Sequence, residues 1–261
     1  MNLNWIEPHK IINIIEIASQ LILQIYNRND YTIENKSDNS PLTEADKKAN
    51  DFICNELKSL YPNIPIISEE NKNDDYNIRS KYTYAWIIDP LDGTKEFINK
   101  NGEFTVNIGL IYINEPIAGF VNIPCKGVTY WSIKDGGAWK KKYNLEESDK
   151  IETNSYHKNN KKIVLASRSH MNDETKKYIE KLGDVELKNV GSSIKIIWIA
   201  ENYADIYPRI APTMEWDTCA ADAILREMKG GCMKYSNENK YLTYNKENLL
   251  NPFFVAKKLE I

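Results

Sequence analysis

The sequence predicts an α/β protein, with an α+β N-terminal part and an α/β C-terminal part. Three observations indicate this class. Apolar residues recur at the helical period early in the chain, strand-like apolar runs bounded by turn residues follow up to residue 133, and strands alternate with helices after residue 160. The chain of 261 residues is 42% hydrophobic and 27% charged, which is typical of a globular protein with enough material for a buried core.

Two amphipathic helices are expected first. Apolar residues at positions 11, 14, 15, 18, 21, 22 and 25 fit the helical period, but acidic residues interrupt them and no cationic segment precedes them. This segment is therefore interpreted as a helix packed on the core, not as a signal peptide or a membrane span. A second helix is predicted at residues 44–60, because Thr43 precedes it and Glu44 and Asp46 lie in its first turn.

Strands are expected next. An apolar stretch at residues 64–67 leads into Ser68, Glu69 and Glu70, and a polar loop follows. Residues 84–88 form a buried-strand pattern that stops at Asp89 and Pro90. Successive strands are predicted between residues 104 and 133, with turns near residues 114–115 and 126–127. The polar segment 140–160 is the best candidate for a joint, and it suggests an N-terminal subdomain of residues 1–155.

The remaining residues, 156–261, are expected to form a C-terminal α/β subdomain. Its predicted strands are residues 163–166, 204–207 and a closing strand at 251–256, and its predicted helices are residues 173–182, 192–201 and 217–228. Gly230 and Gly231 are expected to end the last of these helices, because glycine is the favoured residue just past a helix C-terminus.

Charge and cysteine content exclude some functions. The formal net charge is −3, so nucleic acid is an improbable partner, whereas a small anion can still bind where cations gather locally. None of the four cysteines forms a Cys-x-x-Cys pair or lies at zinc-finger spacing from a histidine. Reduced cysteines in a cytoplasmic protein are the expected state.

The most informative stretch is residues 86–94, where an apolar strand runs into Asp89-Pro-Leu-Asp-Gly-Thr94. Divalent cations such as Mg²⁺ take oxygen ligands. A turn at this point can aim Asp89, Asp92 and the Leu91 carbonyl at one position. Ordinary turn chemistry also explains Asp-Pro and Asp-Gly. An EF-hand is excluded, because the further acidic residues of its loop are absent.

Two other acidic positions could join this site. Glu69 follows an apolar stretch, and Asp217 lies where a helix is predicted to begin. Each also has a structural explanation, since a pair of glutamates is commonly a solvated surface and an aspartate at a helix start is commonly a cap.

Four motifs together resemble the inositol monophosphatase superfamily, which consists of lithium-sensitive, magnesium-dependent phosphatases. They are Pro41-Leu-Thr-Glu-Ala-Asp46, Ser68-Glu-Glu70, Asp89-Pro-Leu-Asp-Gly-Thr94 and Trp216-Asp-Thr218. The resemblance covers about residues 10–256 and implies an αβαβα layered sandwich with the metal site at the junction of two subdomains. It implies that two or three Mg²⁺ ions are held by the following residues: Glu69, Asp89, the Leu91 carbonyl, Asp92 and Asp217.

The resemblance also implies a mechanism. Asp46 and Thr94 would form a pair that orients the attacking water and takes its proton, while the metal ions neutralise phosphate charge. No phosphoenzyme intermediate is expected, because positioning and charge stabilisation account for most of phosphoryl-transfer catalysis.

Further motifs in the second half resemble one branch of the superfamily, the 3′(2′),5′-bisphosphate nucleotidases of the CysQ type. These motifs are Ala166-Ser-Arg-Ser-His170, Gly191-Ser-Ser-Ile-Lys195 and Tyr207-Pro-Arg209. The branch hydrolyses adenosine 3′,5′-bisphosphate, a by-product of sulfotransfer, to AMP and phosphate. The implied substrate contacts are Gly93, Thr94, His170, Ser192, Ser193, Lys195, Arg209 and Asp217. Alternatively, the serines cap a helix, Lys195 is solvated and His170 is structural.

Two other functions stay open at this point. The first is a phosphatase of inositol 1-phosphate or of sugar phosphates, which would share the metal motifs but not the pair of motifs containing Lys195 and Arg209. The second is an inactive nucleotide-binding sensor, for which loss of a ligand or of the Asp46 and Thr94 pair would be the signature. The expected partner is a small nucleotide, without a nucleic-acid polymer or a membrane anchor, and the expected assembly is a monomer or a homodimer.

Overall fold

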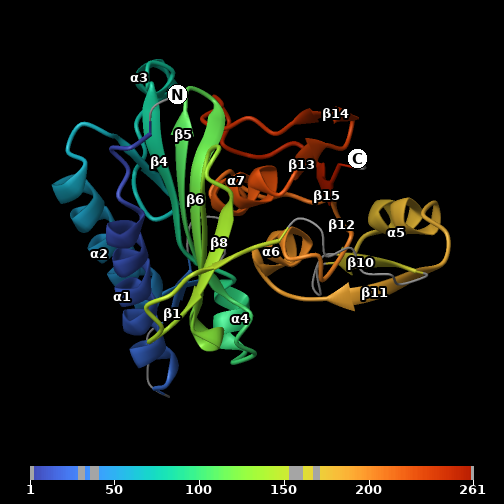
Figure 1. Cartoon of the computed structure of the whole chain (residues 1–261), viewed down its shortest axis with the longest axis horizontal. Coiled ribbons are helices and arrows are strands. Elements are labelled where there is room, and N and C mark those ends of the chain that lie inside the picture. Colours follow the sequence, from blue (N-terminus) through green and yellow to red (C-terminus); the bar gives the residue numbers. More distant parts are fainter. Residues whose placement is uncertain (1–2, 29–32, 36–40, 153–160, 167–170, 260–261) are drawn as a thin grey trace.

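The computed structural model describes residues 3–28, 33–35, 41–152, 161–166 and 171–259, and within these residues the chain forms five layers (Figure 1). The layers are the helix pair α1 (Pro8–Tyr26) and α2 (Glu44–Leu60), a first sheet, the helices α6 (Ile194–Ala200) and α7 (Cys219–Glu227), a second sheet, and helix α5 (Asp173–Glu180). The predicted αβαβα layering is confirmed.

The first sheet has the order β3-β4-β5-β6-β7-β8-β9. Its strands are β3 (Ile66–Ser68), β4 (Tyr84–Asp92), β5 (Thr105–Tyr112), β6 (Glu115–Ile123), β7 (Val128–Ile133), β8 (Ala138–Lys142) and β9 (Asp149–Lys150). β3 is parallel to β4, and the other neighbours are antiparallel. The turns expected near residues 114 and 126 are confirmed. The expectation of a loose segment from residue 140 is wrong at its start, because β8 and β9 pair there despite their polar side chains.

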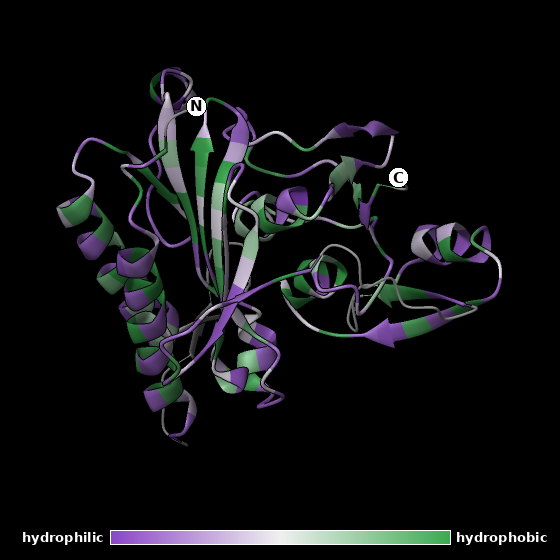
Figure 2. Ribbon diagram, viewed as in Figure 1, coloured by the Kyte–Doolittle hydropathy of each residue, from purple (hydrophilic) through white to green (hydrophobic). Residues whose placement is uncertain are grey.

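Both faces of this sheet are buried. On β4, Trp86 and Ile88 pack toward α1 and α2, whereas Ala85 and Ile87 pack toward α6 and α7. Successive side chains of a strand point to opposite faces, so a continuous apolar run is what a strand between two helical layers requires. Figure 2 shows hydrophobic colours along much of the first sheet, whereas the outer helices α1 and α2 carry both hydrophobic and hydrophilic residues.

Two glycines allow α7 to lie directly against the first sheet. A Cβ atom at Gly119 would come within 2.0 Å of the Ala220 carbonyl oxygen, and one at Gly109 within 2.6 Å of Cys219 Sγ. No larger residue fits at this separation. The close contact places the N-terminus of α7, and the residues just before it, beside β5 and β6.

The second sheet has the order β11-β10-β12-β15-β13-β14. Its strands are β10 (Lys162–Ala166), β11 (Val185–Asn189), β12 (Ile206–Arg209), β13 (Gly230–Lys234), β14 (Asn237–Tyr241) and β15 (Phe254–Lys258). The closing strand predicted at residues 251–256 is β15, and it lies inside the sheet between β12 and β13. The strands β11, β13 and β14 are findings of the structure that the sequence did not predict.

The expected glycine ending of the last helix is wrong. Helix α7 ends at Glu227, Lys229 adopts the left-handed conformation with φ of 60°, and Gly230 and Gly231 belong to β13. At Gly230 a Cβ atom would meet the Lys257 carbonyl oxygen at 2.6 Å. Gly230 therefore allows β13 and β15 to approach each other closely.

The helix α2 begins as the sequence predicted. The Thr43 side chain accepts a hydrogen bond from the Ala45 N–H, and the Asp46 carboxylate accepts one from the Thr43 N–H at 2.8 Å. These reciprocal bonds form a capping box. They fix the Asp46 carboxylate at the start of the helix.

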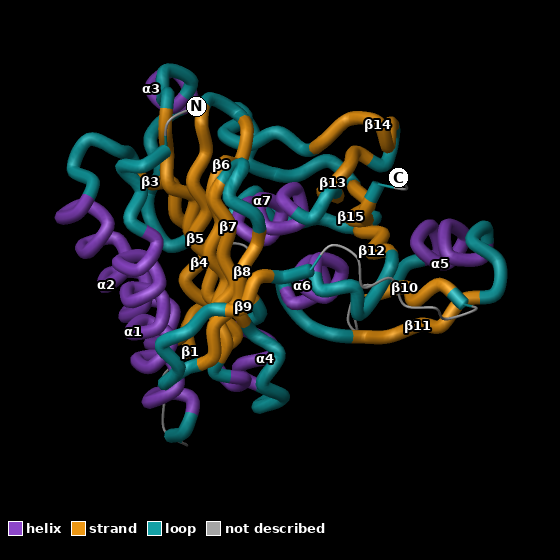
Figure 3. Tube along the Cα trace, viewed as in Figure 1, coloured by secondary structure: helices purple, strands orange, loops and turns teal. Residues whose placement is uncertain are grey.

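Shorter elements complete the described chain (Figure 3). They are β1 (Ile33–Asn35), β2 (Pro41–Thr43), α3 (Tyr76–Arg79), α4 (Thr94–Ile98) and the 3-10 turn η1 (Pro124–Lys126). Across the described ranges, we find no helix that combines the length and the apolar character needed to cross a membrane.

Candidate metal centre

The first two carboxylates of the site come from one irregular strand. The sequence predicted that this strand stops at Asp89, but in the structure β4 continues to Asp92. Asp89 pairs with Asn107 and Asp92 with Thr105, so the register shifts between them. Pro90, which has no N–H to donate, lies within this bulge. The bulge lets two carboxylates three positions apart lie on the same side of the strand.

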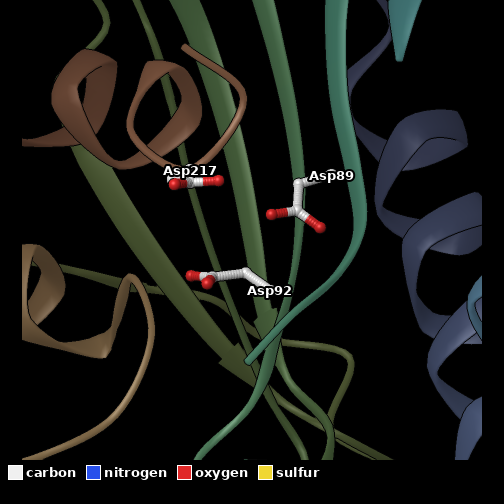
Figure 4. Close-up of side chains that lie close together, drawn as sticks. All are labelled: Asp89, Asp92 and Asp217. Atoms are coloured by element: carbon white, nitrogen blue, oxygen red, sulfur yellow. The ribbon is translucent and has the colours of Figure 1, made fainter. Parts of the chain in front are cut away.

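The third carboxylate comes from the residue that precedes the N-cap of α7. Asp217 is held by the Met214 N–H, which donates to its Oδ2 at 3.0 Å. One carboxylate oxygen from each of Asp89, Asp92 and Asp217 lies within 4.8 Å of the others. Figure 4 shows the three groups around a common space. Residues 125 or more positions apart in the sequence thus meet at one point.

The electrostatics of this cluster are unfavourable without a cation. Burial raises the pKa of Asp89 well above its usual value, and the charges of Glu69, Asp92 and Asp217 raise it further. Burial also raises the pKa of Asp92 to about 6, against the opposing effect of Lys195 and the Ser193 N–H. The pKa of Asp217 is raised by burial and by Asp92 and Glu69. One buried and two half-buried carboxylates at this spacing fit a divalent cation, which removes their repulsion.

Glu69 lies beside the cluster. Its N–H donates to the Ile88 carbonyl at 3.2 Å, one residue before Asp89. Its charge acts on all three aspartates. The parallel pairing of β3 with β4 accounts for this placement, because it brings the end of β3 to the end of β4.

The Thr94 hydroxyl lies between two predicted site groups. It donates to Asp46 Oδ1 at 3.2 Å and lies 3.4 Å from the Leu91 carbonyl oxygen. The other oxygen of Asp46 is taken by Thr43. Thr94 begins α4 and follows Gly93, whose φ of 95° is a conformation that favours glycine.

A pocket of about 130 Å³ extends from the carboxylates toward the second sheet. Its lining includes the predicted residues Asp92, Gly93, Ser192, Ser193, Lys195, Arg209 and Asp217. Ser192 has a positive φ of 53°, and the Ser193 N–H donates to Asp92 Oδ2 at 2.6 Å. Neither serine caps α6 through its side chain, since Ser193 is the N-cap residue and makes no side-chain cap bond.

In the described part of the chain, three cationic residues line the pocket, Lys95, Lys195 and Arg209, and the last two make hydrogen bonds to backbone carbonyls. Lys195 is only 5% exposed, and its Nζ donates to the Val190 carbonyl at 3.0 Å and lies over the Tyr207 ring. The alternative of a solvated lysine is therefore wrong. Burial lowers the pKa of Lys195 to about 8, although the Asp92 charge opposes the shift. Arg209 donates from one terminal nitrogen to Pro212, and its buried Nε has no hydrogen-bond partner among the described residues.

Several residues that support the site were given no individual role in the sequence analysis. The Thr105 hydroxyl lies 2.8 Å from the Ser192 and Ser193 hydroxyls, and Asn107 accepts a bond from Ser193 at 2.8 Å. The Glu103 carboxylate accepts a bond from the Gly191 N–H at 2.9 Å. Thr105 and Asn107 alternate with apolar residues along β5, which is a local signal for these two, whereas Glu103 precedes the strand. His170, predicted to contact substrate, lies outside the described residues.

Residues 9–258 match the model of the inositol monophosphatase family. The chain is 38% identical over 239 residues to the 3′(2′),5′-bisphosphate nucleotidase CysQ of Escherichia coli K12, covering 91% of this chain and 94% of that protein. It is 37% identical to the protein of the same name from Buchnera aphidicola of Acyrthosiphon pisum, covering 96% and 93%.

Solved structures agree. The crystal structure of CysQ from Bacteroides thetaiotaomicron superposes with a TM-score of 0.86 at 40% identity, covering 97% of each chain. The suhB protein of Bartonella henselae superposes with a TM-score of 0.78 at 18% identity, covering 96% of this chain and 93% of that one. The second comparison supports a shared fold and nothing more.

Proposed function

The chain belongs to the inositol monophosphatase family, and from this premise we propose that its carboxylate cluster holds two or three Mg²⁺ ions. The chain is a phosphoric monoester hydrolase of the 3′(2′),5′-bisphosphate nucleotidase type, as its similarity to CysQ proteins over nine-tenths of its length supports. Its reaction releases phosphate from adenosine 3′,5′-bisphosphate and leaves AMP.

The donor set carries the metal proposal. The proposed ligands are Glu69, Asp89, the Leu91 carbonyl, Asp92 and Asp217, all of which supply the oxygen atoms that Mg²⁺ prefers. Burial, and after it the neighbouring carboxylates, raises the pKa of Asp89 and of Asp217, and a bound cation would offset both effects. When bound, Mg²⁺ supplies positive charge that stabilises the phosphate oxygens and makes water more acidic.

We assign Thr94 and Asp46 to the attacking water. The Thr94 hydroxyl donates to Asp46 Oδ1, so its own oxygen is free to accept a hydrogen bond from water. As the water oxygen bonds to phosphorus, its proton moves to Thr94 Oγ1, and the Thr94 proton moves to Asp46. The capping box holds Asp46 in place for this transfer, because its Oδ2 is bound to Thr43. The phosphorus–ester oxygen bond breaks as the new bond forms, with no covalent enzyme intermediate.

The pocket beside the carboxylates accounts for a second phosphate. Lys195 and Arg209 bring two positive charges to it, and Ser192 brings a hydroxyl. Arg209 can make paired hydrogen bonds with a phosphate, which a lysine cannot. Ser193 contributes its backbone N–H to Asp92 and its hydroxyl to Asn107, so its role is to hold the metal side of the pocket. Contacts from Gly93, Thr94, Asp217 and His170 to the substrate stay predictions.

The alternatives are less well supported. An inositol monophosphatase needs no second anion site, so the presence of Lys195 and Arg209 in the pocket, beside the acidic residues Asp92, Glu96 and Asp217, favours the bisphosphate. An inactive sensor would not need the Thr94–Asp46 contact, which the structure contains. We further propose a cytoplasmic enzyme that is a monomer or a homodimer. All four cysteines are free thiols, in keeping with a reducing compartment.

Metal removal tests this proposal. Protein stripped with a chelator should release no phosphate from adenosine 3′,5′-bisphosphate, and added Mg²⁺ should restore release. Asp92→Asn should not recover at any Mg²⁺ concentration, whereas the control Asp173→Asn should behave as the original protein, because the Asp173 side chain is 87% exposed on α5. Full activity after chelation would refute the proposed metal site.

A further inference from the structure

A second cavity lies on the other side of α6 from the metal centre. It measures about 550 Å³ and is bounded by η1, β7 and β8 of the first sheet, by α6, and by β10 and β11 of the second sheet. This volume suits a ligand of nucleotide size. Lys195 in the first turn of α6 lines the metal-side pocket, whereas Trp198 near the end of α6 lines this second cavity, which we call the α6–β8 cleft. Figure 1 shows α6 between the two sheets.

The α6–β8 cleft is strongly cationic. Its lining contains four lysines, Lys126, Lys140, Lys142 and Lys188, and one carboxylate, that of Glu201. The Glu201 side chain is 5% exposed, and its two oxygens are engaged by the Tyr130 hydroxyl at 2.8 Å and by Lys140 at 3.0 Å. Lys188 is paired with Glu186 at 3.2 Å, so the surplus positive charge of the lining comes from Lys126 and Lys142, although the whole chain is acidic. A local surplus of this size attracts anions.

Aromatic surface accompanies the charge. Trp198 is partly buried, and the Lys126 ammonium lies over its ring, 5.1 Å from the centroid. Tyr203, which follows α6, is 50% exposed although it is a large aromatic residue. Val128 and Ile163 add apolar side chains to the lining of the cleft. A ligand that satisfies both features carries an aromatic ring and an anionic group, since rings stack on aromatic side chains and lysines bind phosphate.

We propose that the α6–β8 cleft is a second binding site, for an aromatic phosphate of the nucleoside monophosphate class. The ring packs against Trp198 and Tyr203, and the phosphate meets Lys126 and Lys142. Neither lysine lines the metal-side pocket, so the site is independent of the metal centre. It does not rest on the identity of the hydrolysed substrate.

Two tryptophans allow the two sites to be observed separately. Trp198 lines the cleft, and Trp216 precedes the proposed metal ligand Asp217. The experiment titrates AMP into the Mg²⁺-loaded protein carrying ¹⁵N-labelled tryptophan and follows each indole N–H signal by NMR, with the signals assigned by Trp198→Phe and Trp216→Phe. We expect the Trp198 signal to shift along its own saturation curve. Ribose 5-phosphate, which has no aromatic ring, should bind the cleft about tenfold more weakly.

Charge reversal provides the decisive variant. Lys126→Glu combined with Lys142→Glu should weaken the AMP response of Trp198 at least about tenfold and leave that of Trp216 unchanged. Both lysines are exposed, so folding should be retained. The matched control is Lys58→Glu with Lys81→Glu, two exposed lysines that do not line the cleft, and it should leave both curves unchanged. A Trp198 signal that does not respond to AMP, or a response that survives the cleft variant, would overturn the proposal.

Discussion

The Ser193 N–H donates a 2.6 Å hydrogen bond to Asp92 Oδ2 across 101 positions of sequence. This bond joins the loop that carries the substrate-side serines to a proposed metal ligand. The Thr105 hydroxyl lies within 3.4 Å of the same carboxylate oxygen and within 2.8 Å of both serine hydroxyls. The metal side and the phosphate side of the pocket are therefore parts of one hydrogen-bonded network.

Removal of the Thr105 hydroxyl tests this network. Thr105→Val keeps the shape but leaves Asp92 and the two serines with one partner fewer, and we expect a loss of about 1–3 kcal/mol of stability and a Mg²⁺ affinity about 10–100-fold weaker. Calorimetric Mg²⁺ titration and thermal unfolding measure the two effects.

The control is Thr129→Val, another buried threonine, which bonds to Asn122 and Glu16 on β6 and α1. It should lose stability to a similar extent and keep its Mg²⁺ affinity. Equal Mg²⁺ affinity in both variants would show that Thr105 does not support the metal ligands.

The Thr94 hydroxyl should matter to turnover more than to binding. Thr94→Val removes the hydroxyl proposed to pass a proton from water to Asp46, so kcat should fall by about 10²–10⁴, whereas Thr94→Ser should stay within about tenfold of the original value. Steady-state kinetics at saturating Mg²⁺ separate kcat from KM. If Thr94→Val kept the kcat of Thr94→Ser, proton transfer through this hydroxyl would be refuted.

The affinity for the bisphosphate should depend on pH through Lys195. Because the pKa of Lys195 is about 8, the ammonium loses its proton as the pH rises through 8, and one of the cations proposed to bind the second phosphate loses its charge. KM for adenosine 3′,5′-bisphosphate should therefore rise between about pH 7 and 9. Lys195→Met should have a high KM that does not change over this pH range. Lys95→Met, a change of another lysine that lines the pocket, should keep the rise in KM with pH. A flat profile in the original protein would contradict the assignment.

Metal-free protein should lose stability as the pH rises. The pKa of Asp92 is about 6 in the folded chain, above its ordinary value of 3.8, so between these values the native state holds more protons than the unfolded state. The free energy of unfolding then falls with rising pH across this window and stays lower above it. We expect the melting temperature of the metal-free protein to be higher at pH 5 than at pH 7, by on the order of 5 °C.

Two further measurements test whether the carboxylate cluster causes this pH dependence. Saturating Mg²⁺ at pH 7 should raise the melting temperature, because it binds only the folded cluster, and Asp89→Asn should flatten the pH dependence by removing one charge. A metal-free protein that is more stable at pH 7 than at pH 5 would contradict the raised pKa values inferred for the cluster.

Much of the fold was predictable because local signals agreed with tertiary structure. The α2 boundaries followed from Thr43 and the acidic first turn, and the capping box confirms them. β11 and β14 were missed because their residues are largely polar and exposed. They form through pairing at the two edges of the second sheet, which sequence periodicity does not report.

The sequence predicted which carboxylates form the site but not how the fold brings them together. The motifs identified the carboxylates, and the structure brings Asp89, Asp92 and Asp217 together. From the sequence, Pro90 indicated the end of a strand. The strand continues because it pairs with β5, whose residues lie 13 or more positions away in the sequence. The roles of Glu103, Thr105 and Asn107 arise where β5 meets the loop before α6, and no local pattern encodes a contact between such distant segments. The division near residue 155 stays a prediction.

The most direct test of the account compares two substrates. Phosphate release with Mg²⁺ is measured from adenosine 3′,5′-bisphosphate and from inositol 1-phosphate, for the original protein, for Lys195→Met and for Asp89→Asn. We predict a kcat/KM for the nucleotide at least ~100-fold higher than for the inositol ester. That preference should shrink in Lys195→Met, and Asp89→Asn should lose both activities. A preference for inositol 1-phosphate, or a preference for the nucleotide that Lys195→Met leaves unchanged, would contradict the account.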